Sequence, residues 1–452
     1  MLRLAAPLVV SFWMRQLFTF VDTLYASMLD ERIAEPAMAA IGLTIPFEFL
    51  MIAMWVGIST GLTSTFSRAM GARESKKLEA YLAASSVLSF ALVPVFAAIG
   101  IAIWFFAGAL SPNDPVVARQ LQIYGSVLIG GSAFTMFWSI IPDSVVKAHQ
   151  DTKATMWAGI WSNVINVGLN TIFTFVFHWG IFGIGLSTVI GRFGGLVYAL
   201  RKAGAHEARR KAAWTNDVAT LDPHPYRSIL RLAAPATAAY GLMAGEAALI
   251  NAVLKALPNA TSALAAYSVY YRVLMFMIMP AVATSVAMLP FTARLWGERD
   301  IRGMRRGLTE ATVALVAYCL LFVAPVVAFG APLLAKLLAK SPDTVGFIVV
   351  SLWLCPIACL TALPFFLCRP MFEGLQMPKP GFVVAILRYV VLTGPLAWLG
   401  AHVATAMGYA GLYGLISGLI AATAISSGVI YGWMLSTLRR IDRTVDLVPS
   451  PA

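Results

Sequence analysis

Leu2-Arg3-Leu4-Ala5-Ala6-Pro7 opens the first apolar stretch of this chain, and the same six residues recur as Leu230-Arg231-Leu232-Ala233-Ala234-Pro235. The two copies lie 228 residues apart in a chain of 452 residues. A repeat at half the chain length predicts two halves that have the same order of structural elements.

The repeat continues in three later segments, each in or directly beside a stretch that is predicted to be a loop. Two of these matches have a shift of 226 residues, and the third has a shift of 228. The matched residues are Arg68, Gly71 and Arg73 with Arg294, Gly297 and Arg299; Gln150 and Lys153 with Gln376 and Lys379; and Gly180 and Gly183 with Gly408 and Gly411. One hexamer can match by chance, but ordered matches along both halves indicate a duplication.

The composition is that of an integral membrane protein. Hydrophobic residues make up 59% of the chain and charged residues only 12%, whereas a soluble domain carries about 25% charged residues. Residues 81–113 and 389–438 contain no Lys, Arg, Asp or Glu. Since roughly 20 apolar residues cross a bilayer as a helix, the longer of these runs must cross twice.

Twelve apolar stretches are long enough to be membrane spans. We expect them near residues 5–28, 38–64, 80–108, 118–141, 154–178, 181–200, 230–256, 262–290, 308–335, 344–368, 381–404 and 409–437. Six spans in each half make the halves parallel, with a pseudo-twofold axis along the membrane normal. We therefore predict an all-α membrane protein with twelve transmembrane helices in two six-helix bundles, at 1–200 and 229–452, joined by a cytoplasmic linker at 201–228.

The distribution of lysine and arginine predicts the orientation. Both termini and the loops after even-numbered spans are rich in these residues, whereas the opposite loops hold only Arg32, Arg119, Lys255, Lys336 and Lys340. Positively charged loops stay in the cytoplasm, so we expect a multi-pass protein of the cell (inner) membrane with both termini cytoplasmic. The net charge of +12 then reflects basic loops beside anionic lipids and not nucleic-acid binding.

The four cysteines are predicted to be packing residues. Cys355 and Cys359 are one helical turn apart, but no histidine or third thiolate accompanies them. A metal site is therefore not expected, and nothing indicates a disulfide framework.

The first span carries a polar stripe. Ser11, Arg15, Thr19 and Asp22 fall within about 80° of one helix face. Such a stripe is expected to face water, here the cargo cavity of a two-lobed transporter. Asp22 has two readings at this stage: a carrier of ions or cationic compounds, or a simple ion-pair partner of Arg15, two turns away.

Four motifs resemble those of multidrug and toxic compound extrusion (MATE) transporters. Phe20-Val21-Asp22-Thr23 resembles the acidic motif of the first helix, and residues 67–73 and 147–153 are similar to the family's loops after helix 2 and before helix 5. Residues 163–170 are similar to the asparagine-rich helix 5. The resemblance spans both halves and implies a secondary transporter for small cationic or amphiphilic molecules.

The branch within that family, NorM-type or DinF-type, stays open. Glu246 resembles the NorM-type acid of helix 7. The NorM-type branch also has an acid in helix 10, but residues 344–368, the corresponding span here, contain none. In helix 5, Asn166 is followed by Asn170 where some members have an acid. The coupling ion, H⁺ or Na⁺, is therefore open as well.

The resemblance and the polarity pattern together give a candidate site for ion coupling and substrate binding. Asp22 is its centre, and Asn163, Asn166, Asn170 and Thr188 are expected to surround it with amide and hydroxyl groups. Na⁺ could be held at Asp22 and Asn166, and no other metal and no cofactor are expected. The asparagines could also serve only to bond neighbouring helices.

A second acid, Glu246, lies on the helix that corresponds to the first span. It is 11 residues from Pro235, whereas Asp22 is 15 from Pro7, which places the two acids roughly 6 Å apart in depth. Arg272 on the next span is predicted at a similar depth. An ion pair of Glu246 with Arg272 would be either structural or a switch that protonation opens.

No Gly-x-x-x-x-Gly-Lys-Ser/Thr loop is present, so an ion gradient must supply the energy. We predict an antiporter, not an enzyme, that exports organic cations or amphiphiles in exchange for H⁺ or Na⁺ and works as a monomer among membrane lipids. The alternative is a flippase for lipid-linked precursors or other amphiphiles, which Arg15, Arg272 and Arg369 would favour. A membrane prenyl transferase would need clustered aspartates, which the sequence lacks.

Overall fold

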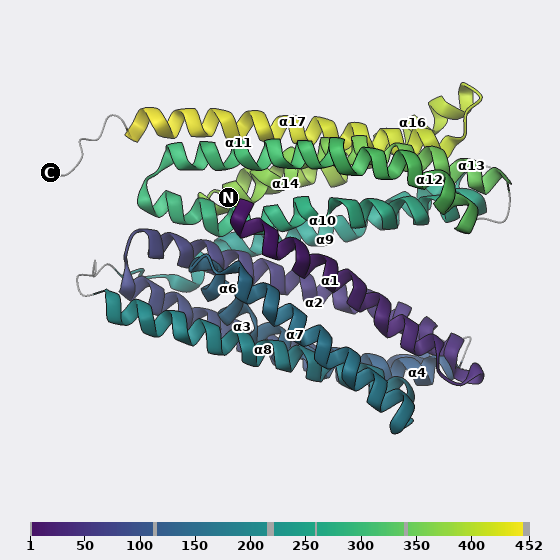
Figure 1. The fold of residues 1–452 in the computed structure, drawn as a ribbon, viewed down its shortest axis with the longest axis horizontal. Coiled ribbons are helices and arrows are strands. Elements are labelled where there is room, and N and C mark those ends of the chain that lie inside the picture. The colour runs from purple at the N-terminus through teal and green to yellow at the C-terminus, as the bar shows by residue number, and fades with distance from the viewer. Residues whose placement is uncertain (1, 112–114, 215–220, 258–259, 339–341, 446–452) are drawn as a thin grey trace. The chain divides into compact units, whose positions relative to one another are not determined.

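The computed structural model describes residues 2–111, 115–214, 221–257, 260–338 and 342–445, and every regular element in these ranges is a helix (Figure 1). The chain divides into two compact units. One consists of Pro7–Thr237, and the other of Ala238–Ala452 together with Met1–Ala6. Each unit has its own hydrophobic core: Phe66, Phe96 and Phe137 are fully buried in the first, and Phe365 and Phe372 in the second.

The first half of the chain contains ten helical elements, and those labelled η are π-helical turns that continue a neighbouring α-helix. They are α1 (Leu2–Ser27), α2 (Glu31–Gly71), α3 (Ser75–Leu110), α4 (Pro115–Gly125), η1 (Ser126–Gly130), α5 (Gly131–Trp138), α6 (Ile140–Ala148), α7 (Thr152–Thr171), η2 (Ile172–Val176) and α8 (Gly180–Ala213).

The second half follows the same order of long helices. Its elements are α9 (Pro225–Lys255), α10 (Ala260–Glu298), α11 (Ile301–Tyr318), η3 (Cys319–Val323), α12 (Ala324–Leu338), α13 (Pro342–Trp353), α14 (Cys355–Gly374), α15 (Pro378–Ile386), η4 (Leu387–Leu392), α16 (Thr393–Ala406) and α17 (Gly411–Val445).

Joining the elements that follow end to end gives twelve long helices at the twelve predicted positions. Among the described residues, nine of them are long and apolar enough to cross a membrane. The other three are α1, α7 with η2, and α9, which carry the polar candidates Asp22, Asn166, Asn170 and Glu246. The stretch 201–228, predicted as a linker, contains the last turns of α8 and the first turn of α9.

The turns between helices repeat in backbone conformation as well as in sequence. Arg73 and Arg299 have φ of 55° and 60°, and Gln150 and Gln376 have φ of 59° and 58°. Residues other than glycine rarely adopt this left-handed conformation. Since each pair is separated by 226 residues, the two halves form the same turns at the same points of the repeat.

Asp222 fixes the start of α9 against α3. Its carboxylate accepts hydrogen bonds from the Tyr81 hydroxyl at 2.9 Å, the Ser228 hydroxyl at 2.6 Å and the His224 backbone N–H at 2.9 Å. Burial acts to raise the pKa of Asp222, but these donors together with nearby Lys77 outweigh it and hold the pKa below its usual value. The chain between the two halves is thus anchored where it enters α9.

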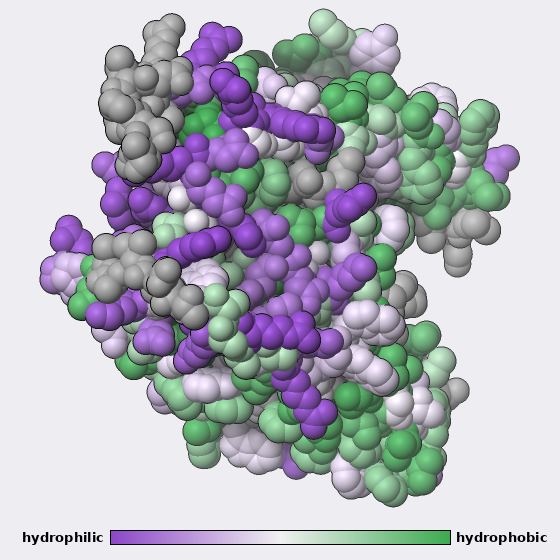
Figure 2. All heavy atoms as spheres, turned by 60° about the vertical axis from the view of Figure 1, so that its left-hand side comes forward, coloured by the Kyte–Doolittle hydropathy of each residue, from purple (hydrophilic) through white to green (hydrophobic). Residues whose placement is uncertain are grey.

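Large apolar side chains cover the flanks of the helices. Phe105, Leu321 and Phe329 expose 73%, 79% and 85% of their surface, which water would disfavour and lipid would not. Figure 2 shows hydrophilic side chains gathered over helix ends and hydrophobic ones along the helix flanks.

The four cysteines, Cys319, Cys355, Cys359 and Cys368, are buried and unbridged.

Small residues let α7 and α8 approach each other closely. A Cβ atom at Gly191 would lie 2.7 Å from the carbonyl oxygen of Ser162, and one at Gly195 would lie 2.8 Å from that of Ala158. Backbone carbonyls cannot move aside as a flexible side chain can. The two helices can therefore bring short polar side chains into direct contact only because these positions are glycine.

We predict that Gly195→Ala destabilises the protein by about 1 to 3 kcal/mol, because the added methyl group separates α7 from α8. Thermal unfolding of the purified protein in detergent measures the effect. Gly168→Ala on α7 is the matched control, since a Cβ there meets no atom within 4 Å. If both variants unfold at the same temperature, the close approach of α7 and α8 is not what stabilises this pair.

Candidate functional site

Asp22 is buried, and its two carboxylate oxygens accept hydrogen bonds from two different helices. Its side chain projects from α1. Oδ1 accepts from Nδ2 of Asn170 on α7 at 3.0 Å, and Oδ2 accepts from Oγ1 of Thr188 on α8 at 2.9 Å. Three helices of one unit therefore meet at one carboxyl group, and Asn170 and Thr188 are both neutral donors.

A second layer of polar groups joins the two donors. Nδ2 of Asn166 donates to Oγ1 of Thr188 at 2.9 Å and to Oγ of Ser187 at 3.3 Å. Nδ2 of Asn170 also lies 3.2 Å from Oδ1 of Asn166. Asn166, Asn170, Ser187 and Thr188 are all almost completely buried, so these contacts replace water for each of them.

The two hydroxyl groups each have an alternative acceptor on their own helix. Ser187 Oγ lies 2.7 Å from Oδ1 of Asn170 and 2.7 Å from the carbonyl oxygen of Ile184. Thr188 Oγ1 lies 2.9 Å from Asp22 and 3.2 Å from the same carbonyl. A hydroxyl has a single hydrogen. Thr188 can therefore donate to the Ile184 carbonyl when Asp22 no longer needs a donor. Ser187 can keep donating to Oδ1 of Asn170 at the same time.

The structure brings together most of the predicted site in the first half. Asp22, Asn166, Asn170 and Thr188 form one network, and Ser187 joins them although sequence reasoning did not select it. Asn163 is half-buried on α7 and takes no part in the hydrogen bonds around Asp22. The side chain of Arg15 lies outside the described residues.

Sequence reasoning also missed Arg192, which is one helical turn after Thr188 on α8. Its guanidinium forms an ion pair with Glu48 of α2, with Nη2 3.2 Å from Oε1. An arginine inside a span that is otherwise nearly uncharged was the available signal. Arg192 and Glu48 both act electrostatically on Asp22. Together the two residues add no net charge.

In the second unit, Glu246 of α9 accepts a hydrogen bond from Oγ1 of Thr393 on α16 at 2.9 Å. Its expected partner, Arg272 on α10, is exposed, and the ion pairs found among the described residues do not include these two. The two residues predicted as a pair are therefore not brought together. Glu246 and Thr393 instead resemble Asp22 and Thr188. In each half, an acid on the first helix accepts a hydrogen bond from a threonine.

Two other arginines lie in the membrane stretches of the second unit. Nε of Arg369 is 3.2 Å from Oε1 of Glu373, and its guanidinium lies over the Tyr240 ring at 5.5 Å. The guanidinium of Arg388 lies over the rings of Phe365 and Tyr389 at 5.1 and 5.0 Å. Sequence reasoning had named only the first of these arginines.

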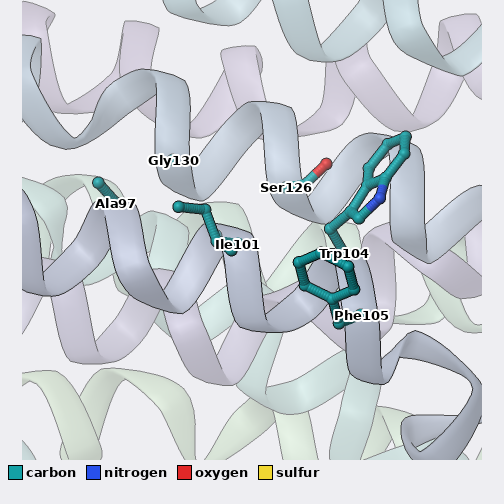
Figure 3. Close-up of a pocket in the computed structure, with 7 residues that line it drawn as sticks. Ala97, Ile101, Trp104, Phe105, Ser126 and Gly130 are labelled. Atoms are coloured by element: carbon teal, nitrogen blue, oxygen red, sulfur yellow. The ribbon is translucent and has the colours of Figure 1, made fainter.

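A pocket of about 440 Å³ lies between α3 and the rod formed by α4, η1 and α5 (Figure 3). Its lining is mostly apolar: Ala97, Gly100, Ile101, Trp104, Phe105, Ser126 and Gly130. None of the polar candidate residues belongs to it. Phe105 and Trp104 are exposed, so this is a crevice on the lipid-facing flank.

The sequence profile of the MatE family matches residues 7–172 and 235–399, which is most of both halves. The chain belongs to the MatE family. Its members are transporters, so this MATE protein is a transporter and a multi-pass membrane protein.

Within the described residues, no group of three or more His, Cys, Asp or Glu side chains could hold a metal ion.

Two curated relatives illustrate the range of this family. The FAD transporter of Shewanella oneidensis is 20% identical over 85% of this chain and 84% of its own length. The probable multidrug resistance protein YoeA of Bacillus subtilis is 26% identical over 60% of this chain and 59% of its own. Neither relative assigns this MATE transporter to the NorM-type or the DinF-type branch.

Solved structures establish the fold. A MOP superfamily transporter from Pyrococcus furiosus, described as having a binding pocket of reversed polarity, superposes with a TM-score of 0.84, at 20% identity and with 98% of this chain and 96% of that one covered. An outward-facing multidrug resistance MATE transporter gives the same TM-score and identity. The prediction of an all-α membrane protein with twelve helices in two pseudo-symmetric bundles is confirmed.

We predict that Arg192→Gln destabilises the protein by roughly 1.5 to 3 kcal/mol, because Glu48 loses a charged hydrogen-bond partner. The double variant with Glu48→Gln should recover most of that loss, because no charge is then left unpaired. Thermal unfolding of the wild type, the two single variants and the double variant completes the cycle.

The exposed pair of Arg294 and Glu298, at 2.9 Å, is the matched control. The same cycle there should give a coupling of less than about 1 kcal/mol, as is usual for solvated pairs. If the loss of stability in the double variant equals the sum of the losses in the two single variants, the ion pair of Glu48 and Arg192 contributes nothing.

Proposed function

We propose that this MATE transporter is a secondary active antiporter, without enzymatic activity or a cofactor, that exports organic cations and related amphiphilic compounds in exchange for H⁺ or Na⁺. The observation that supports it is the Asp22 carboxyl, buried and bonded by Asn170 and Thr188. Ionisable groups in membrane helices are costly, so their presence indicates function. Here the group can hold a cation when charged and release it when neutralised.

The network around Asp22 gives the proposed cycle two states. With Asp22 charged, Thr188 and Asn170 donate to it. When a proton or a sodium ion neutralises the carboxylate, the hydroxyl of Thr188 can donate to the Ile184 carbonyl instead, while Ser187 keeps its bond to Oδ1 of Asn170. The buried polar groups stay bonded in both states, so switching carries no large desolvation penalty.

A flippase for lipid-linked precursors would need an uncompensated basic site for a diphosphate. Of the arginines that would favour such a cargo, Arg369 has a carboxylate partner and Arg272 is exposed. Arg388 is a single guanidinium over two aromatic rings and does not by itself make a diphosphate site. The antiporter is therefore the better supported proposal. We place the protein in the cell membrane, with both termini and the segment 201–228 in the cytoplasm, on the strength of the lysine and arginine distribution. We propose that it works as a monomer.

The experiment that tests the proposal is efflux of a fluorescent organic cation from proteoliposomes under an imposed pH gradient or Na⁺ gradient. We expect one of the two gradients to drive efflux, and that gradient identifies the coupling ion. If neither gradient moves the cation, the antiporter assignment is wrong.

In the same assay, Asp22→Asn should abolish coupled exchange, because the amide is nearly the same size but cannot take or release a proton. Size-exclusion chromatography verifies that the variant remains folded. The control is Glu310→Gln, which should exchange like the wild type. Glu310 is a partly exposed acid on α11, 2.9 Å from Arg306. Normal coupling in Asp22→Asn would remove Asp22 from the mechanism.

Glu246 allows a second coupling ion in each cycle. Exporting one monovalent cation against 100 mV costs about 2.3 kcal/mol, and one returning proton supplies the same amount. One-for-one exchange is therefore insensitive to voltage, whereas two ions per cation respond to it. We predict that a potassium–valinomycin potential, negative inside, accelerates wild-type exchange and has no such effect on Glu246→Gln.

The outcome separates the two roles left open for Glu246. A carrier loses its voltage response on substitution while pH- or Na⁺-driven exchange persists. If Glu246 is only the structural partner of Thr393, the variant should keep whatever voltage response the wild type has and should unfold at a lower temperature.

A further inference from the structure

Arg388 is an arginine of the second unit, and two of its three guanidinium nitrogens have no hydrogen-bond partner among the described residues. It lies in η4, between α15 and α16. Its Nε and Nη1 atoms are buried and have no hydrogen-bond partner, although the residue as a whole is only partly buried. Buried N–H groups normally have an acceptor, and exceptions need an explanation. The need for an acceptor is greater for a charged donor, because leaving it unsatisfied costs more free energy than leaving a neutral donor unsatisfied.

The surroundings of Arg388 are aromatic. Its guanidinium lies over Phe365 and Tyr389, whose rings are 6.2 Å apart and nearly perpendicular. These rings stabilise the cation through their faces, and they also hold the guanidinium in one position. Aromatic faces do not, however, accept hydrogen bonds as a carboxylate or phosphate does, so the directional capacity of the guanidinium remains unused.

An acid lies nearby without pairing to Arg388. The hydroxyl of Thr393 is 2.8 Å from the backbone carbonyl of Arg388 and 2.9 Å from the Glu246 carboxylate. Arg388 is close enough to act electrostatically on Glu246, yet no ion pair forms between these two described residues. A positive and a negative group thus lie in one cluster, held apart from each other, with flat rings beside the positive one.

Arg369 shows that this arrangement is not a general feature of membrane arginines in this chain. It also lies over an aromatic ring, that of Tyr240, but Glu373 pairs with it at 3.2 Å. The two arginines are both placed on aromatic faces, and they differ in whether the protein provides a carboxylate. Arg388 has no carboxylate partner in the described part of the chain. The planar set of N–H donors on its guanidinium therefore matches the geometry of an acidic group on a ligand.

We propose that Arg388 is the anion-binding residue of a subsite for flat aromatic compounds that carry a carboxylate or phosphate group. The acidic group bonds to the guanidinium, the aromatic part lies beside Phe365 and Tyr389, and Glu246 attracts any cationic group of the same molecule. This subsite rests on the proposed transport function and specifies which residue of this chain binds the acidic group of such a cargo. No covalent step is involved.

Rhodamine 110 and rhodamine 123 form a matched pair of probes, because they are the free acid and the methyl ester of one flat dye. Fluorescence anisotropy with the purified full-length protein in detergent measures the binding of each. We expect Arg388→Gln to weaken binding of rhodamine 110 about tenfold, as loss of a charge-assisted bond would. Binding of rhodamine 123, which has no carboxylate, should remain within about twofold of wild type.

Arg369→Gln is the matched control and should bind both dyes like the wild type. If that variant does not fold, Arg306→Gln, an exposed arginine of the same unit, takes its place. Arg388→Lys keeps the charge but lacks the planar fork, so rhodamine 110 should still lose affinity selectively. That variant decides the question if Arg388→Gln cannot be purified.

Three outcomes would overturn the proposal: equal losses for both dyes, unchanged binding of both, or no binding of rhodamine 110 to the wild type. Failure here is distinct from failure of the antiporter. Ion-driven efflux of rhodamine 123 from proteoliposomes, with Arg388 variants unaltered in dye binding, would leave the transport function standing and remove only the subsite.

Discussion

The constraint on which the first unit depends is that a carboxylate inside a membrane must have its hydrogen bonds satisfied by protein. An unpaired charge at the centre of a bilayer costs about 2.5 to 3.5 kcal/mol by insertion measurements. Asp22 meets this constraint through Asn170 and Thr188, which lie on different helices. Three helices must therefore pack closely at this point, and Gly191 and Gly195 allow two of them to do so.

The same constraint is met differently in the second unit. Glu246 has the hydroxyl of Thr393, but the described residues beside it include no counterpart of the asparagine network around Asp22. Instead the cluster contains an arginine, Arg388, whose positive charge lies near the acid without an ion pair. Duplication gave the two halves the same helices and turns. The polar side chains within those helices have since diverged, so the two units offer different chemistry on similar backbones.

The fold could be predicted from the sequence because it depends on features that are local or repeated. Apolar runs set the helices, and the match of Arg73 with Arg299 and of Gln150 with Gln376 located turns that have the same left-handed conformation. Candidate residues on α7 and α8 were predictable because Asn166, Asn170 and Thr188 are polar in apolar spans. Pairing was not predictable in the same way, since Arg272 has a suitable depth but does not meet Glu246.

The sequence by itself determined that this is a duplicated helical membrane protein with a buried acid at Asp22, because span length, apolar runs and repeated turns are written along the chain. Only the tertiary structure decided which polar groups meet. It joined Ser187 to the Asp22 network, paired Arg192 with Glu48, and placed Arg388 over two aromatic rings with its Nε and Nη1 atoms without an acceptor among the described residues. The physical reason is that hydrogen bonds and ion pairs act over about 3 Å, so they depend on the rotation and approach of neighbouring helices, which helical periodicity and depth alone do not fix.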